Sequence, residues 1–81
     1  MKAALDISIY PLTENYKAEV LAFIEDLKTE PSLTVITNNL STQIGGDYDL
    51  VFDTVKKALK KFHATKKAVA IIKIAEGIDI Q

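Results

Sequence analysis

Hydroxyl, amide and carboxylate side chains gather in the segment 40–49, which reads Leu-Ser-Thr-Gln-Ile-Gly-Gly-Asp-Tyr-Asp. Side chains alternate between the two faces of a strand, so Ser41 and Gln43 should point to one face and Thr42 and Ile44 to the other. On at least one face, therefore, the strand carries polar side chains that packing in a hydrophobic core does not explain. We therefore expect a ligand to bind along this segment.

A second polar group comes from the N-terminal segment, where Ser8 and Tyr10 would lie close to residues 41–43 if the two segments form neighbouring strands. Hydroxyl and amide groups can hydrogen-bond the edge of a heteroaromatic ring, and an aromatic side chain can stack on its face. The candidate ligand-binding residues are Ser8, Tyr10, Phe23, Ser41, Thr42, Gln43 and Asp47. Each also has a purely structural interpretation, such as core or interface for the two rings and a helix cap for Asp47.

The charge pattern favours a cationic ligand over an anionic one. All ten basic residues are lysines, so the chain lacks the arginine fork that holds a phosphate or carboxylate by two hydrogen bonds. Carboxylates at Asp6, Asp47 and Asp49 lie close in sequence to the polar segments, and they would attract a positive ring and repel a phosphate.

No group in the sequence is a convincing catalyst. His63 is the single histidine, and a charge at a helix C-terminus explains it well. Cysteine is missing, no nucleophile motif accompanies the histidine, and no spacing of side chains suits a metal ion. The glycines at 45 and 46 lack a P-loop ending, and an acylphosphatase-type reaction would need an arginine. We expect no catalytic residue, no metal ion and no cofactor.

Composition limits the remaining classes. The 81 residues show no break in composition, which predicts a single domain over residues 1–81. The formal net charge of −1 gives no field that would attract nucleic acid, and no apolar run is long enough for membrane insertion. The lack of cysteine and of a signal-peptide pattern fits a cytoplasmic location.

The hydrophobic periodicity predicts the elements that position these residues. Residues 3–11 alternate like a strand, and residues 16–27 carry an apolar helical stripe that Thr13 or Asn15 could cap. Two short antiparallel strands are expected between 33 and 44 with a turn at Asn38-Asn39, followed by a helix that Asp47 or Asp49 opens. Residues 68–74 form a last strand, and residues 75–81 are a short tail.

This order, βαββαβ, predicts an α+β ferredoxin-like sandwich in which an antiparallel sheet carries both helices on one face. The last strand is apolar on both of its faces, with Val69 and Ile71 on one and Ala70 and Ile72 on the other. A second subunit packed against the free face is the simplest cover for it. We expect a homodimer or homotetramer that associates through the sheet face.

The sequence resembles the YkoF-like thiamine-binding protein family over nearly its whole length. The resemblance rests on Ile-Ser-Ile-Tyr-Pro-Leu at 7–12, on the segment 40–49 and on Ile-Ile-Lys-Ile at 71–74. It implies a ferredoxin-like domain that associates through its sheets and binds thiamine or its hydroxymethylpyrimidine part without catalysis, in uptake, storage or sensing of the vitamin. Carried onto this chain, it marks Ser8, Ser41, Thr42 and Asp47.

Two departures from that family and one alternative function remain open. This chain holds one such unit, whereas the best-known thiamine binder of the family carries two in tandem, and the tail at 75–81 lacks the charged extension of single-domain relatives. The alternative is a structural or regulatory oligomerisation module with no small-molecule ligand. In that case Ser8, Tyr10 and Ser41 would be buried against a neighbouring subunit with no pocket between them.

Overall fold

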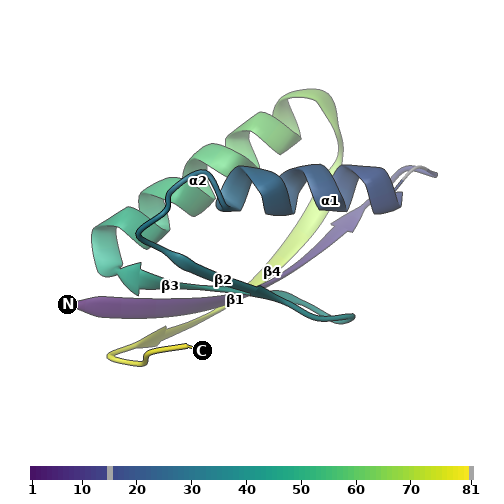
Figure 1. Ribbon diagram of the computed structural model, residues 1–81. Helices are drawn as coiled ribbons and strands as arrows, with labels where there is room; N and C mark the ends of the chain where they lie inside the picture. Colours follow the sequence, from purple (N-terminus) through teal and green to yellow (C-terminus); the bar gives the residue numbers. More distant parts are fainter. Residues whose placement is uncertain (15, 81) are drawn as a thin grey trace.

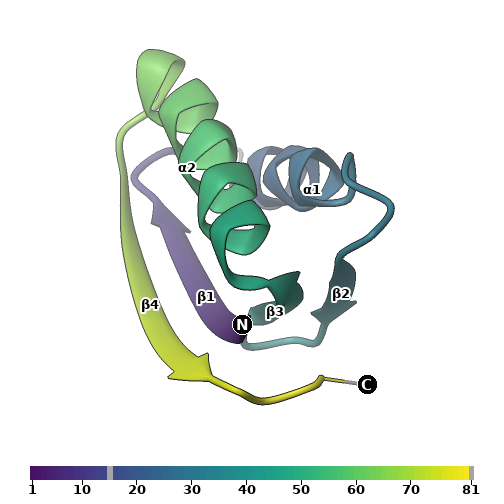
Figure 2. The same ribbon diagram turned by 90° about the vertical axis from the view of Figure 1, so that its left-hand side faces the viewer.

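Four strands and two helices make up the computed structural model, which describes residues 1–14 and 16–80. The elements are β1 (Lys2–Pro11), α1 (Tyr16–Leu27), β2 (Thr34–Thr37), β3 (Thr42–Asp47), α2 (Tyr48–Thr65) and β4 (Ala68–Glu76). The strands pair antiparallel in the order β2-β3-β1-β4, and both helices cover one face of the sheet (Figures 1 and 2). The predicted ferredoxin-like α+β fold is confirmed.

The core lies between that face of the sheet and the two helices. Strand β1 contributes every second residue, Ala3, Leu5 and Ile7, because alternate side chains of a strand share a face. Its partner on β3 is Ile44, which is opposite Leu5. The helices close the core with an apolar stripe each, namely Phe23, Ile24 and Leu27 from α1 and Val51, Val55, Ala58 and Phe62 from α2.

Helix α2 starts where the sequence predicts. Asp47 is its N-cap, and the carboxylate oxygen Oδ2 accepts a hydrogen bond of 3.1 Å from the backbone N–H of Leu50. Helix α1 starts at Tyr16. Of its two predicted caps, Thr13 instead donates its hydroxyl to the Glu19 carboxylate at 2.9 Å, and Asn15 lies outside the described residues.

In the described part of the chain, neither helix lies on the other face of the sheet (Figure 2). Tyr10, Val69 and Ile71 are each slightly more than half exposed there, and the β1–β4 register places Tyr10 opposite Val69. Strand β4 runs two residues further than expected, to Glu76, and the chain then folds back beneath the sheet (Figure 2). The apolar free face that the last strand predicts is therefore present in this chain.

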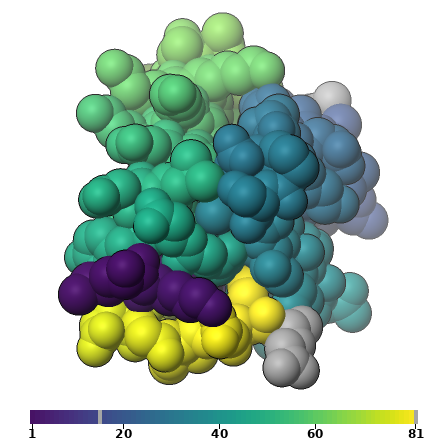
Figure 3. All heavy atoms as spheres, turned by 60° about the vertical axis from the view of Figure 1, so that its left-hand side comes forward, coloured from purple at the N-terminus to yellow at the C-terminus, as the bar shows by residue number. Residues whose placement is uncertain are grey.

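The C-terminal segment covers one end of this free face. A side chain at Gly45 would have its Cβ only 3.0 Å from the Cγ1 of Ile80, and Lys2 pairs with Asp79 at 2.7 Å. Figure 3 shows the yellow C-terminal segment packed along the purple N-terminal residues at the base of the molecule. This end of the sheet lies far along β1 from Tyr10.

Candidate ligand-binding site

A cleft of about 660 Å³ opens between α1, the last residues of β1 and the turn that joins β2 to β3. We call it the α1–turn cleft. Its walls are residues 7–11, residues 37–42, and Tyr16, Lys17, Val20, Leu21, Phe23 and Ile24 of α1. The volume is in the range of small-molecule sites, and the lining combines apolar side chains with a few hydroxyl and amide groups.

The cleft exists because β1 continues past the residue at which β3 begins. The β1–β3 ladder ends at the pair Ile7–Thr42, whereas the β1–β4 ladder continues to Pro11. Residues 38–41, just before Thr42, form a turn that leads away from β1. The Asn38 N–H donates to the backbone oxygen of Ser41 at 3.0 Å, and the side-chain Oδ1 of Asn38 accepts from the backbone N–H groups of Leu40, at 2.8 Å, and Ser41, at 3.0 Å. Within residues 1–14 and 16–80, the last residues of β1 therefore have no paired strand on that side.

Two of the predicted polar residues lie where β3 begins: Thr42 is its first residue, and Ser41 precedes it and points to the opposite face. Ser41 is half-buried and donates its hydroxyl to Oδ1 of Asp6 at 2.6 Å. Since a carboxylate can only accept, the Ser41 oxygen keeps its lone pairs for a donor in the cleft. Thr42 is buried, and its hydroxyl shares a 3.2 Å hydrogen bond with that of Thr37.

Ser8 contributes a further hydroxyl side chain to the lining of the cleft. Its Oγ donates to the backbone oxygen of Leu40 in a long bond of 3.4 Å. Like Ser41, it therefore has acceptor capacity to offer to a bound molecule. The hydroxyls of Ser8 and Ser41 are matched to a ligand with hydrogen-bond donors, such as an aromatic amino group.

The two predicted stacking rings differ in availability. Phe23 lines the floor of the cleft but is only 2% exposed, and its ring packs edge-on against Phe62 with centroids 6.0 Å apart. Tyr10 also lines the cleft and is 52% exposed. A third ring, Tyr16 at the start of α1, lines the cleft and is 51% exposed. Tyr10 and Tyr16 are the rings with free surface for stacking.

Gln43 and Asp47 are not among the residues that line the α1–turn cleft. Gln43 is opposite Asp6 in the ladder, so its half-buried side chain shares the free face of the sheet. Asp47 lies at the far end of β3, opposite Lys2. The structure thus brings together Ser8, Tyr10, Phe23, Ser41 and Thr42, and it places Asp47 at the start of α2.

Replacing Asp47 by alanine should lower the free energy of unfolding by about 1 kcal/mol, because the Leu50 N–H loses its cap. The affinity for a ligand in the α1–turn cleft should stay within twofold of the original. Chemical denaturation and ligand titration of the variant measure the two effects separately. A large loss of affinity at unchanged stability would make Asp47 part of the binding site.

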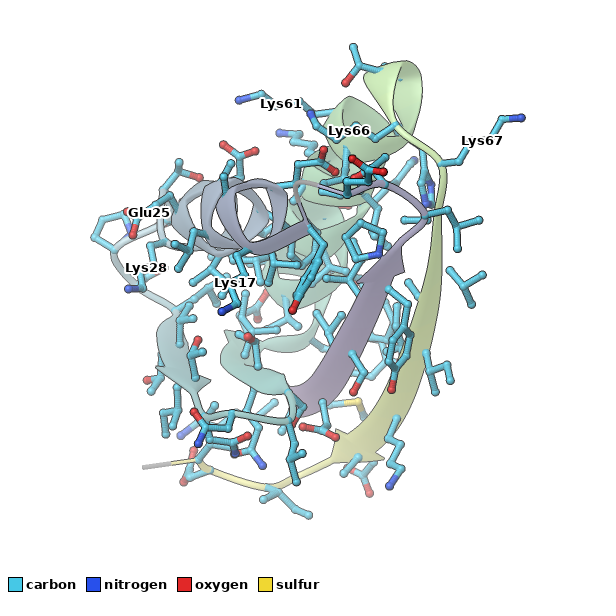
Figure 4. The ribbon with its side chains drawn as sticks, turned by 90° about the vertical axis from the view of Figure 1, so that its right-hand side faces the viewer. Lys17, Glu25, Lys28, Lys61, Lys66 and Lys67 are labelled. Carbon is cyan, nitrogen blue, oxygen red and sulfur yellow. The ribbon has the colours of Figure 1, made fainter. Side chains whose placement is uncertain are left out.

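The sequence interpretation missed Tyr16, Lys17, Asn38 and Asn39 as cleft residues. Tyr16 fits the apolar helical stripe, and two adjacent asparagines are an ordinary turn signal. Figure 4 shows Lys17 below α1, on the side of the sheet, whereas Lys61, Lys66 and Lys67 lie above α1. Lys17 is thus the basic side chain among the described residues that line the cleft.

Neither helix in the described part of the chain has the length and hydrophobicity needed to cross a membrane. Residues 1–14 and 16–80 also hold no group of three or more His, Asp or Glu side chains that could bind a metal ion. The lysines at the end of α2 are exposed, and Lys61 pairs with Asp26 at 3.0 Å.

The fold and the cleft define a ferredoxin-like α+β domain with a small-molecule-sized opening at one end of its sheet. A model of the YKOF-related Family matches residues 2–75. The chain belongs to this family, as the sequence resemblance indicates. A comparison with curated proteins finds no match.

Several solved structures share the fold. A Streptococcus pneumoniae protein has a TM-score of 0.85 at 25% identity, with 96% of this chain and 89% of that chain covered. A hypothetical protein from Methanocaldococcus jannaschii has a TM-score of 0.81 at 29% identity, with coverage of 99% and 84%. A Thermotoga maritima protein, proposed to act in thiamine biosynthesis or salvage, has a TM-score of 0.79 at 17% identity, with coverage of 91% and 82%.

Proposed function

We propose that the chain is a non-catalytic binding protein for thiamine or its hydroxymethylpyrimidine part, in uptake, storage or sensing of the vitamin. The observation that carries the proposal is the convergence of Ser8, Tyr10, Phe23, Ser41 and Thr42 on one cleft, from segments far apart in sequence. Membership in the YKOF-related family and the thiamine assignment proposed for the Thermotoga maritima protein support it.

The chemistry of the cleft suits an aminopyrimidine. The ring would stack on Tyr10 or Tyr16, and its exocyclic amino group would donate one hydrogen to the hydroxyl oxygen of Ser8 or Ser41. Of the three carboxylates expected to attract a positive ring, Asp6 is the one hydrogen-bonded to a cleft hydroxyl, that of Ser41 at 2.6 Å, and its negative charge would favour a cationic ligand. The thiazolium end of thiamine would lie toward the open side of the cleft.

Isothermal calorimetry with thiamine and with hydroxymethylpyrimidine tests the proposal. We expect saturable heat with both compounds, and the stoichiometry reports the number of sites per chain. Ser41→Ala should weaken thiamine binding at least about tenfold, because it removes an acceptor and leaves Asp6 without its donor. Ser32→Ala is the control, because Ser32 is exposed and its hydroxyl also donates to a carboxylate, that of Glu30. This variant should bind thiamine as tightly as the unmodified chain does.

Replacing Lys17 by glutamate should tighten thiamine binding about threefold at low salt, because a cation leaves the cleft wall and an anion takes its place. The gain should shrink at 0.5 M salt, since exposed charges are screened. Lys28→Glu changes the net charge equally at the other end of α1 and is the control. Equal affinities for both variants would show that the ligand charge lies far from Lys17.

We also propose that a second copy covers the free face of the sheet, forming a homodimer or homotetramer. The apolar side chains Tyr10, Val69 and Ile71 form the exposed surface that such a contact would bury. The same surface supports the second candidate function, a structural or regulatory oligomerisation module without a ligand. Sedimentation of the protein together with calorimetry separates the two, because the module assembles but gives no heat with either compound.

A further inference from the structure

The direction of each backbone group along β1 follows from three hydrogen bonds. The Gly77 N–H donates to the backbone oxygen of Lys2 at 2.8 Å, and the Leu12 N–H donates to that of Lys67 at 2.9 Å. The backbone N–H and C=O of even-numbered β1 residues therefore point toward β4. The Tyr48 N–H donates to the oxygen of Met1 at 2.9 Å, on the β3 side. Odd-numbered residues therefore direct both their N–H and C=O toward β3.

Ile9 is the first odd-numbered residue of β1 beyond its ladder with β3. The ladder would place Leu40 opposite it, but the Leu40 N–H is held by Asn38 and its oxygen takes the Ser8 hydroxyl. Within residues 1–14 and 16–80, no backbone or side-chain partner is found for the N–H and C=O of Ile9. Ile9 is half-buried and lines the α1–turn cleft.

We propose that the main chain of Ile9 recognises the ligand, with its N–H donating to a ring nitrogen and its C=O accepting from the adjacent amino group. An unpaired donor and acceptor on a half-buried strand are costly, so a molecule that satisfies both gains specificity as well as affinity. The ligand class is a planar heterocycle with an amino group next to an unprotonated ring nitrogen, the pattern of an aminopyrimidine edge. This inference rests on the proposed function.

The N–H and C=O of Ile9 should reject a ligand in which the hydrogen-bond donor and acceptor are exchanged. An oxo group beside a ring N–H, as in oxythiamine, places an acceptor against the Ile9 carbonyl and a donor against its N–H. Sites that hydrogen-bond a substrate group reject analogues that leave buried polar atoms unpaired far more strongly than apolar pockets reject a change of size. The unmodified chain should therefore bind thiamine at least about 100-fold more tightly than oxythiamine.

Replacing the backbone N–H of Ile9 by oxygen tests whether this selectivity comes from Ile9. Replacing the residue by the α-hydroxy acid of the same side chain turns its N–H into an ester oxygen, and thiamine affinity should fall about tenfold. Ile72 is the matched control, because its N–H points outward from the edge strand β4 by the same alternation. The ester at Ile72 should leave affinity unchanged, and thermal melting of both variants should be similar.

The outcomes separate the inference from the function it rests on. Tight thiamine binding with equal affinity for oxythiamine, or with an undiminished affinity in the Ile9 ester, overturns the role of Ile9 and leaves the thiamine proposal standing. No binding of thiamine or hydroxymethylpyrimidine by the unmodified chain overturns both. Selective binding that the Ile9 ester loses and the Ile72 ester retains supports the inference.

Discussion

Phe23→Ala should lower the free energy of unfolding by about 3–5 kcal/mol, a large part of what holds a domain of this size together. The residue is 2% exposed and packs its ring edge-on against Phe62, so the truncation leaves a cavity between α1 and α2. Urea denaturation followed by circular dichroism measures the loss.

Leu21 supplies the control on the same helix, because it is 63% exposed. Leu21→Ala should change stability by no more than about 0.5 kcal/mol. If Phe23→Ala instead kept its stability and lost thiamine binding, Phe23 would be the stacking ring that the sequence suggests, and the packing described here would be wrong.

Gly46→Ala should cost about 2–4 kcal/mol, from backbone strain and overpacking together. Gly46 has a φ of +149°, which side chains rarely adopt, and a Cβ at this position would lie 2.6 Å from Cδ2 of Leu33. Leu33 is buried, so its side chain has little room to move. The midpoint of thermal unfolding gives the effect directly.

The substitution Gly77→Ala separates the cost of backbone strain from the cost of steric crowding. Gly77 also has a positive φ, +72°, but a Cβ there would meet no atom of the described residues within 4 Å. Gly77→Ala should therefore cost only about 1 kcal/mol, the strain alone. Equal losses at Gly46 and Gly77 would mean that Leu33 moves aside freely and that crowding contributes nothing.

The fold could be predicted because the hydrophobic pattern and the chain order agree at each element. Alternation along β1, the helical stripe ending at Leu27, and Asp47 before α2 each have one reasonable local structure, and the six elements in this order have a familiar arrangement. The turn at Asn38-Asn39 is where the asparagine signal places it.

The shape of the site could be predicted only in part. Sequence proximity suggests that Ser41 and Asp47 act together, but a strand rises about 3.3 Å per residue, which separates them by roughly 20 Å. That Lys17 and Tyr16 would line the cleft depends on how α1 lies across the sheet, which no local pattern specifies. The residue at which β3 begins to pair with β1 depends on the turn before it, which Asn38 closes with two side-chain hydrogen bonds and one backbone hydrogen bond.

The contact between Ile80 and Gly45 limits where another copy can dock. With that end of the free face covered, the exposed apolar surface is concentrated around Tyr10, which also borders the cleft. The proposed second copy and the proposed ligand would use the same Tyr10 side chain, so self-association and ligand binding would be thermodynamically linked. The measured affinity for the ligand should then vary with protein concentration, and the degree of assembly should vary with ligand by the reciprocal factor.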